Sequence, residues 1–186
     1  MTTELTIATA VTAGAVLAGL LIGWGLRHNL STLSYRRPTE QHLPLPRHQW
    51  TIPLCTAAGA GLLAFRVNQT GNWETALLAG PVLVLGIWLA AVDVEVQRLP
   101  FRQVATLGLL ESITLAGITI TTRSPHTAIL GAAGGILGYV TFRVFHHASR
   151  GGLGYGDVTL AAPLAAATTA AGGPVIVSSA TWSPSA

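Results

Sequence analysis

The only two aspartates of the chain stand where an apolar block meets a more polar stretch. Asp93 ends a long apolar run, and Asp157 follows a glycine-rich turn that includes Gly154 and Gly156. Two carboxylates held together at the edge of a low-dielectric region would share one proton, because repulsion and desolvation both oppose the second charge. The ionised partner could then take a proton from water while the protonated partner polarises a peptide carbonyl. The pair therefore predicts aspartic-type hydrolysis of a peptide bond, which needs no metal and no cofactor.

The surroundings of the two aspartates leave a structural alternative open. Asp93 could simply end one helix in the headgroup layer, and Asp157 could cap the next helix. In the functional interpretation, Gly154 and Gly156 shape a turn that lets a substrate strand approach the backbone closely. The helix macrodipole favours Asp157 as the anion, so Asp93 is the better candidate to hold the shared proton.

The composition is that of a membrane protein. Of the 186 residues, 50% are hydrophobic and 9% are charged, and the mean hydropathy is +0.54. A soluble domain has about a quarter of its residues charged, so most of this surface must face the lipid bilayer. All ten positive residues are arginines scattered between apolar blocks, which argues against a nucleic-acid partner. The single cysteine, Cys55, excludes an internal disulfide framework and a cysteine-rich zinc site.

Apolar blocks predict about six membrane segments, because a bilayer core of about 30 Å requires roughly 20 apolar residues in a helix. The blocks are residues 5–26, 51–65 with an extension through 49 and 50, 75–92, 103–122, 127–142, and the uncharged stretch after Asp157. We therefore expect an all-α, multi-pass transmembrane bundle that forms one domain over residues 1–186. The first block has no basic residue before it, so we interpret it as a retained anchor and not as a signal peptide.

The arginines in the short connections predict the orientation, because positive residues stay on the cytoplasmic side. Eight arginines fall in the first, third and fifth connections or just beside them, and only two fall in the others. The N-terminus is then outside, and residues 27–48 form a cytoplasmic loop. Two crossings separate Asp93 from Asp157, so the chain returns to the same face and both aspartates face the cytoplasm.

Two glutamates are secondary candidates for the site. Glu111 lies near the middle of block 103–122, where an ionisable group is costly and marks a functional site by default. It could serve a proton path or a small transporter, or it could be a protonated side chain hydrogen-bonded between helices near Ser112 and Thr114. Glu95 follows Asp93 by two residues and could assist the site, although a solvated loop charge is the simpler interpretation.

Small residues in block 127–142 predict a close helix contact. Gly131, Gly134, Gly135 and Gly138 leave room for a neighbouring backbone, and Gly131 and Gly135 form a Gly-x-x-x-Gly pair. We expect this surface to serve packing within the bundle rather than dimerisation.

Two motifs resemble the signatures of a known family. The stretch Asp-Val-Glu-Val-Gln-Arg-Leu-Pro, from Asp93 to Pro100, and the stretch Gly-Tyr-Gly-Asp, from Gly154 to Asp157, resemble those of type IV prepilin peptidases, the Gly-x-Gly-Asp intramembrane aspartic proteases. In that family each signature supplies one catalytic aspartate, so the resemblance implies that Asp93 and Asp157 are the catalytic pair. It also implies a prepilin-like substrate, whose short basic leader is cleaved at the cytoplasmic face of a bacterial plasma membrane.

The chain departs from the family pattern in several places. The loop 27–48 lacks the Cys-x-x-Cys motifs of bifunctional members, so we do not expect N-methylation of the new amino terminus. Thr159 stands where the family often has lysine. The chain ends 29 residues after Asp157, whereas the family usually continues through further membrane segments, and Gly-Gly-Pro at 172–174 is expected to interrupt the last block. A non-enzymatic alternative follows, namely a shortened, inactive membrane protein that binds or scaffolds pilin-like helices.

Overall fold

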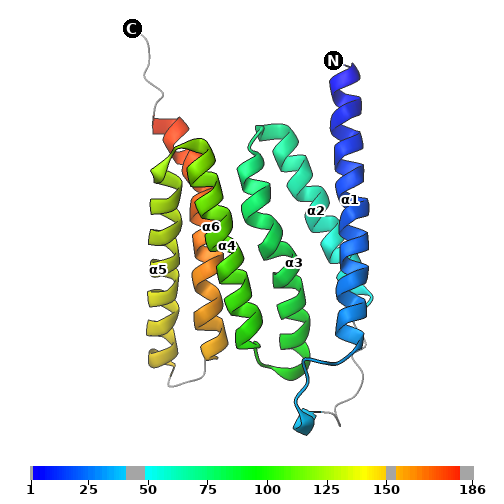
Figure 1. Ribbon diagram of the computed structural model, residues 1–186, viewed down its shortest axis with the longest axis vertical. Coiled ribbons are helices and arrows are strands. Elements are labelled where there is room, and N and C mark those ends of the chain that lie inside the picture. The colour runs from blue at the N-terminus through cyan, green and yellow to red at the C-terminus, as the bar shows by residue number, and fades with distance from the viewer. Residues whose placement is uncertain (1, 41–48, 150–153, 181–186) are drawn as a thin grey trace. The chain divides into compact units, whose positions relative to one another are not determined.

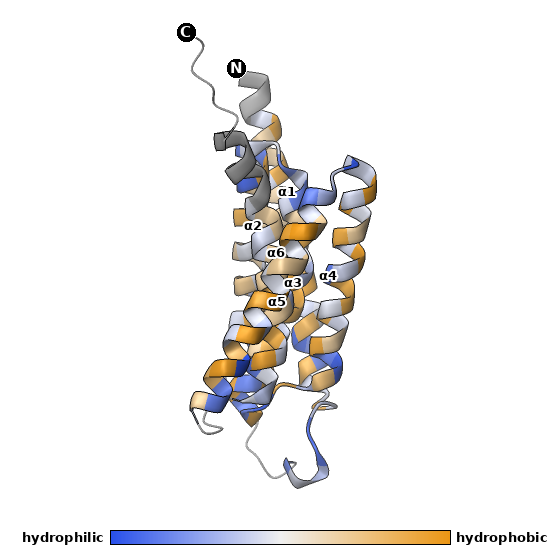
Figure 2. Ribbon diagram, turned by 90° about the vertical axis from the view of Figure 1, so that its left-hand side faces the viewer, coloured by the Kyte–Doolittle hydropathy of each residue, from blue (hydrophilic) through white to orange (hydrophobic). Residues whose placement is uncertain are grey.

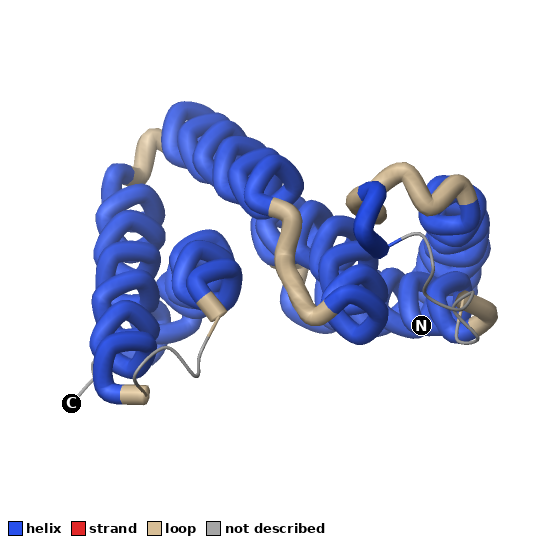
Figure 3. Tube along the Cα trace, turned by 90° about the horizontal axis from the view of Figure 1, so that it is seen from below, coloured by secondary structure: helices blue, strands red, loops and turns tan. Residues whose placement is uncertain are grey.

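The computed structural model describes residues 2–40, 49–149 and 154–180. Within these ranges the chain is helical, with turns and short loops between the helices and no strand (Figure 1, Figure 3). The helices are α1 (Thr2–Ser31), the short 3-10 helix η1 (Pro38–Glu40), α2 (Thr51–Thr70), α3 (Trp73–Val96), α4 (Phe101–Thr122), α5 (Pro125–Ala148) and α6 (Tyr155–Ala180). Each predicted apolar block therefore corresponds to a helix of its own, although residues 49 and 50 precede α2 and residues 181–186 lie outside the described residues.

Among the described residues, four helices are long and apolar enough to cross a bilayer. They are Thr6–Ser31 of α1 and the whole of α3, α4 and α5, each with 22 to 26 residues. Large apolar side chains project outward along them, for example Leu21 with 76% and Ile120 with 75% of its surface exposed. Figure 2 shows hydrophobic residues along the lengths of the helices. Such surfaces suit lipid and not water, so the predicted all-α, multi-pass membrane fold is confirmed.

The observed helices differ from the predicted blocks mainly at their ends. α1 continues to Ser31, so the polar loop begins at residue 32 and not at 27. Arg27 stays in the helix, where its guanidinium carbon lies 3.5 Å from the centre of the Trp50 ring. The expected interruption at residues 172–174 is wrong, because α6 continues through them to Ala180. Glycine and proline are tolerated in membrane helices, where water does not compete for the backbone. Residues 41–48 of the predicted loop lie outside the described residues.

Residues 1–103 form one compact unit, in which α1 packs on α2 and α2 packs on α3. α1 approaches the backbone of α2 at Gly19, where an added Cβ would lie 2.7 Å from the carbonyl oxygen of Thr56. Between α2 and α3 the chain reverses within two residues, Gly71, which has φ 67°, and Asn72, whose side chain caps α3. The carboxyl ends of α1 and α3 consequently lie at the same end of this unit (Figure 1).

Residues 104–186 form a second compact unit, in which α5 packs along α6. The α5 glycines face α6 so closely that a Cβ added to Gly134 would lie 2.8 Å from the carbonyl oxygen of Ala165. Across the same contact, Thr169 of α6 donates a hydrogen bond to the carbonyl oxygen of Leu130 at 3.0 Å. The prediction that these glycines serve packing within the bundle is confirmed.

α4 and α5 form a hairpin within the second unit. Only Arg123 and Ser124 connect them, and Leu115 of α4 lies against Gly131 of α5. Because α5 is in turn antiparallel to α6, the amino-terminal parts of α4 and α6 lie at the same end of this unit. That end carries Asp157.

Candidate active site

Asp93 lies in the last turn of α3, with its side chain half-buried. Its backbone carbonyl accepts a hydrogen bond from the N–H of Gln97 at 2.8 Å. Gln97 has φ 51°, in the left-handed region that residues other than glycine rarely adopt, and this conformation ends the helix. The structure places Asp93 at a membrane-helix end, where the sequence predicted it, while its catalytic role stays a prediction.

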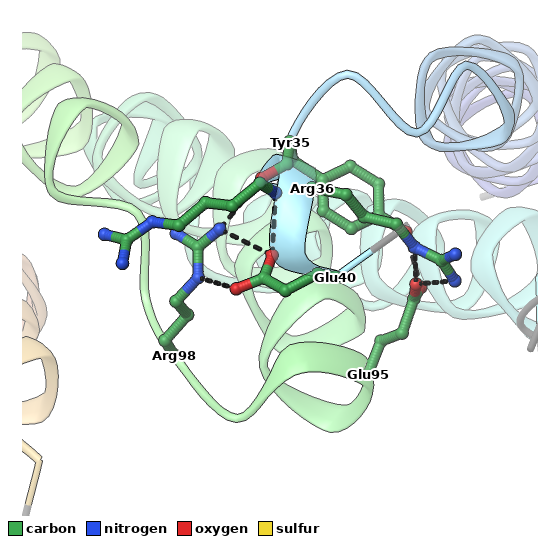
Figure 4. A network of polar contacts seen from close by, with 6 residues as sticks. Tyr35, Arg36, Glu40, Glu95 and Arg98 are labelled. Carbon is green, nitrogen blue, oxygen red and sulfur yellow. Dashed lines mark hydrogen bonds and ion pairs between the residues drawn. The ribbon is translucent and has the colours of Figure 1, made fainter. Parts of the chain in front are cut away.

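The loop after α1 contacts this end of α3 through Glu95 (Figure 4). The Tyr35 hydroxyl donates a hydrogen bond to Oε2 of Glu95, and Arg36 forms a hydrogen bond and an ion pair with Oε1. The Arg36 side chain is only 2% exposed and that of Glu95 is 11% exposed. The expectation that Glu95 is a solvated loop charge is therefore wrong, since Glu95 lies in the last turn of α3 and its carboxylate binds Tyr35 and Arg36. Burial, together with the hydrogen bond to Glu95, raises the pKa of Tyr35 to about 12.

A second polar contact joins the same loop to the residues that follow α3. Arg98 donates from Nε and Nη2 to the two carboxylate oxygens of Glu40, both at 2.8 Å, in the paired geometry that strengthens arginine–carboxylate contacts. Nη2 also donates to the carbonyl oxygen of Tyr35 at 3.1 Å. The hydrogen bonds from Arg98 lower the pKa of Glu40 to about 2.

Sequence reasoning did not predict these partners. Tyr35, Arg36, Glu40 and Arg98 were not among the predicted site residues. The available signal was the presence of opposite charges in two segments that the arginine distribution already placed on one face.

Asp157 lies in the first turn of α6 and is half-buried. Its N–H donates a hydrogen bond to the carbonyl oxygen of Gly154 at 3.1 Å. A Cβ added to Gly154 would lie 3.3 Å from Oδ2 of Asp157, so the carboxylate lies close over the glycine. Gly156 is in the same turn, and its carbonyl oxygen accepts a hydrogen bond from Thr159 at 2.8 Å. Both predicted glycines are therefore adjacent to the second aspartate.

Aromatic and cationic contacts hold the beginning of α6 to the end of α5. The guanidinium carbon of Arg143 lies 5.4 Å from the centre of the Tyr155 ring, within the range of a cation–π contact. His146 meets the same ring edge-on, with the ring centres 6.1 Å apart. Tyr155, in the middle of the Gly-Tyr-Gly-Asp motif, thus helps to set where α6 begins.

Glu111 is buried in α4, with 3% of its surface exposed. In the part of the chain that the structure describes, neither of its carboxylate oxygens has a hydrogen-bond partner. Ser112, its neighbour in α4, donates to the carbonyl oxygen of Gly108 at 2.8 Å. The alternative that Glu111 is hydrogen-bonded between helices is therefore wrong within the described residues.

Comparison with known protein families decides the relationship of the chain. The model of the type IV leader peptidase family matches residues 80–182, more than half of the chain, including Asp93 and Asp157. The chain belongs to the type IV leader peptidase family. The resemblance seen in the two motifs is thereby confirmed. No curated protein and no solved structure gave a match.

Membership in the type IV leader peptidase family supports a leader-peptidase function in general. Asp93 belongs to the compact unit 1–103 and Asp157 to the unit 104–186. Each is held at a helix end by contacts within its own unit, and their pairing stays a prediction. Glu111 lies near the middle of α4.

Proposed function

We propose that the protein is an aspartic-type endopeptidase that removes the basic leader of prepilin-like proteins at the cytoplasmic face of a bacterial plasma membrane. The observation that carries this proposal is the family match over residues 80–182, which includes the only two aspartates of the chain. Both aspartates lie at the ends of helices, where a carboxylate can reach a substrate at the membrane boundary.

The helix order supports a common face for the two aspartates. α4 begins shortly after Asp93, and within the second unit the amino-terminal parts of α4 and α6 lie at the same end. α4 and α5 are both long and apolar enough to cross a bilayer. A chain that leaves the face of Asp93 through α4 and returns through α5 therefore brings Asp157 back to that face. The arginine distribution makes this face cytoplasmic.

The proposed chemistry requires a water molecule between the two carboxyl groups. The ionised aspartate takes a proton from the water, and the resulting hydroxyl attacks the carbonyl carbon of the scissile bond. The protonated aspartate, for which Asp93 is the candidate, polarises the carbonyl oxygen. When the tetrahedral intermediate collapses, the C–N bond breaks and the leaving nitrogen takes a proton from a carboxyl group. The glycines of the Gly-Tyr-Gly-Asp turn leave space beside Asp157 for an extended substrate.

Processing of a tagged prepilin in a bacterial host tests the proposal. Asp93→Asn and Asp157→Asn should each slow leader removal by roughly 10²- to 10⁴-fold, the usual contribution of a general acid or base. Glu74→Gln is the matched control, because this carboxyl group lies in the first turn of α3, at the opposite end from Asp93. The readout is the size shift of the prepilin on a gel, with expression of each variant checked by immunoblot.

Three outcomes separate the functional classes. Loss of cleavage in both aspartate variants, with cleavage retained in the control, supports the peptidase. Normal cleavage in either aspartate variant refutes the catalytic pair. A wild-type protein that binds prepilin in the membrane without cleaving it supports the scaffold alternative.

A second candidate function, a small transporter, is favoured by one observation. Glu111 is buried in a membrane-length helix and has no hydrogen-bond partner among the described residues. Proton relays in transporters use carboxyl groups of this kind. Under the peptidase proposal Glu111→Gln should leave prepilin processing intact, whereas a transporter would lose proton-coupled uptake in that variant.

A further inference from the structure

The α3 end that carries Asp93 is held from two sides by residues 32–40, which we name the clamp loop. On the helix side, Tyr35 and Arg36 bind Glu95. Beyond the helix end, Glu40 binds Arg98 through two hydrogen bonds (Figure 4). Glu95 and Arg98, which receive these two contacts, are three residues apart in sequence, and the chain bends between them.

The backbone at this bend is hydrogen-bonded to the backbone of Asp93. Gln97 lies between Glu95 and Arg98 and adopts φ 51°, a conformation that costs free energy in any residue with a Cβ. Its N–H donates to the carbonyl oxygen of Asp93. Contacts on both sides of Gln97 offset this cost, so the clamp loop stabilises the last hydrogen-bonded turn on which Asp93 stands.

Further contacts to α3 lie before Asp93, at Trp88. The indole Nε1 of Trp88 donates to the side-chain oxygen of Asn29 at 3.1 Å, and its ring meets Tyr35 edge-on at 6.1 Å between ring centres. Trp88 and Glu95 are seven residues apart and therefore lie on the same side of the helix, two turns from each other. The segment around Asn29 and the clamp loop thus contacts α3 both before and after Asp93.

We propose that the clamp loop positions the Asp93 carboxylate for catalysis, a role that rests on the peptidase function proposed above. Tyr35, Arg36, Glu40 and Arg98 act through the last turn of α3 and not by touching the substrate. Acidic residues beside an active site could instead bind the basic leader. The carboxyl groups of the clamp are already paired with arginines, and the Arg36 side chain is 2% exposed, which favours positioning.

Kinetics of leader removal by the purified full-length protein in detergent separate positioning from leader binding. Arg36→Ala should lower kcat by roughly 10- to 100-fold, the effect of a small misplacement of a reacting group, with KM changed by less than about twofold. Arg36→Lys keeps the charge but loses the planar fork and should fall between wild type and Arg36→Ala. A lower KM with unchanged kcat would show that Glu95 had become available to the leader, and would overturn the proposal.

Arg66→Ala is the matched control for removal of an arginine. Arg66 is exposed near the carboxyl end of α2, at the opposite end of the compact unit 1–103 from the clamp loop. It should leave kcat and KM at wild-type values. Tyr35→Phe removes one hydroxyl and keeps the Arg36–Glu95 pair, so it should lower kcat by a smaller factor than Arg36→Ala. This variant replaces Arg36→Ala in the test if Arg36→Ala does not fold.

A spin label on α3 tests the clamp without any activity measurement. Val94 is 79% exposed next to Asp93, and Cys55 is the only cysteine, so Val94→Cys in a Cys55→Ala background gives one labelling site. The nitroxide spectrum should show greater mobility with Arg36→Ala and no change with Arg66→Ala. An unchanged spectrum together with an unchanged kcat would overturn the proposal. Retained cleavage in Asp93→Asn would refute the proposed peptidase function. The nitroxide spectrum would still show whether the clamp loop restricts the motion of the α3 end.

Discussion

Gly138 provides a direct test of how closely α5 and α6 pack. A Cβ added there would lie 2.6 Å from the Cβ of Ala165 and 2.9 Å from the carbonyl oxygen of Ala161. Ordinary contacts between carbon atoms are about 3.5–4.0 Å. The Ala161 oxygen belongs to the helix backbone and cannot rotate away, so Gly138→Ala must push the two helices apart.

The expected cost follows from a comparison with an open position. Gly117→Ala in α4 adds a methyl group that meets nothing within 4 Å. Both substitutions gain up to about 1 kcal/mol from the better helix propensity of alanine, and this gain cancels when the variants are compared. The remainder is the overpacking penalty, about 1–3 kcal/mol. Gly135→Ala should be intermediate, because its added Cβ would lie 3.3 Å from the carbonyl oxygen of Ala162.

Thermal unfolding in detergent, followed by far-ultraviolet circular dichroism, measures the difference. At about 2–4 °C per kcal/mol for a chain of this size, Gly138→Ala should melt roughly 2–12 °C below Gly117→Ala. Stability should rise in the order Gly138→Ala, Gly135→Ala, Gly117→Ala. If Gly138→Ala melts together with or above Gly117→Ala, the close α5–α6 contact is wrong, and with it the placement of the beginning of α6.

Two further predictions concern carboxyl groups. The pKa of Glu40 is about 2 in the folded protein, below its ordinary value of 4.5. Its stabilising contribution should therefore be complete above about pH 5 and be lost as the pH falls toward 2, and Glu40→Gln should flatten this part of the melting-temperature profile. Glu111→Met should raise stability by about 1–3 kcal/mol, because it removes a buried polar group without a partner, and a lower melting temperature would show that Glu111 makes a stabilising contact.

Much of the fold could be predicted from local sequence. The apolar blocks located the six α-helices of the described residues, because a helix satisfies its backbone hydrogen bonds within a single segment, as lipid requires. Helix ends were less predictable. Arg27 lies inside α1, where its side chain stacks on Trp50, a residue just before α2 that the local pattern around Arg27 does not contain.

The site was predictable where residue type carried the signal and not where it depended on contacts. Asp93 and Asp157 stood out as the only aspartates of an apolar chain, and the family match covers both. Glu95 was misinterpreted as a loop charge, since nothing near it in sequence shows that Tyr35 and Arg36 return to cover it. For Glu111 the alternative of a hydrogen bond between helices was wrong in the described residues, since residue type does not show whether a neighbouring helix brings a partner to the carboxylate.

The sequence by itself determined the membrane class, the helices and the two candidate aspartates, because hydropathy and residue chemistry act locally and need no partner. Only the tertiary structure decided which residues support those aspartates. The clamp loop contacts α3 about 60 residues further along the chain, as in the hydrogen bond of Tyr35 to Glu95. The packing role of the α5 glycines depends on the α6 backbone that lies opposite them. Contacts of this kind depend on how whole helices pack, and packing is a property of surfaces that the chain forms only after it has folded.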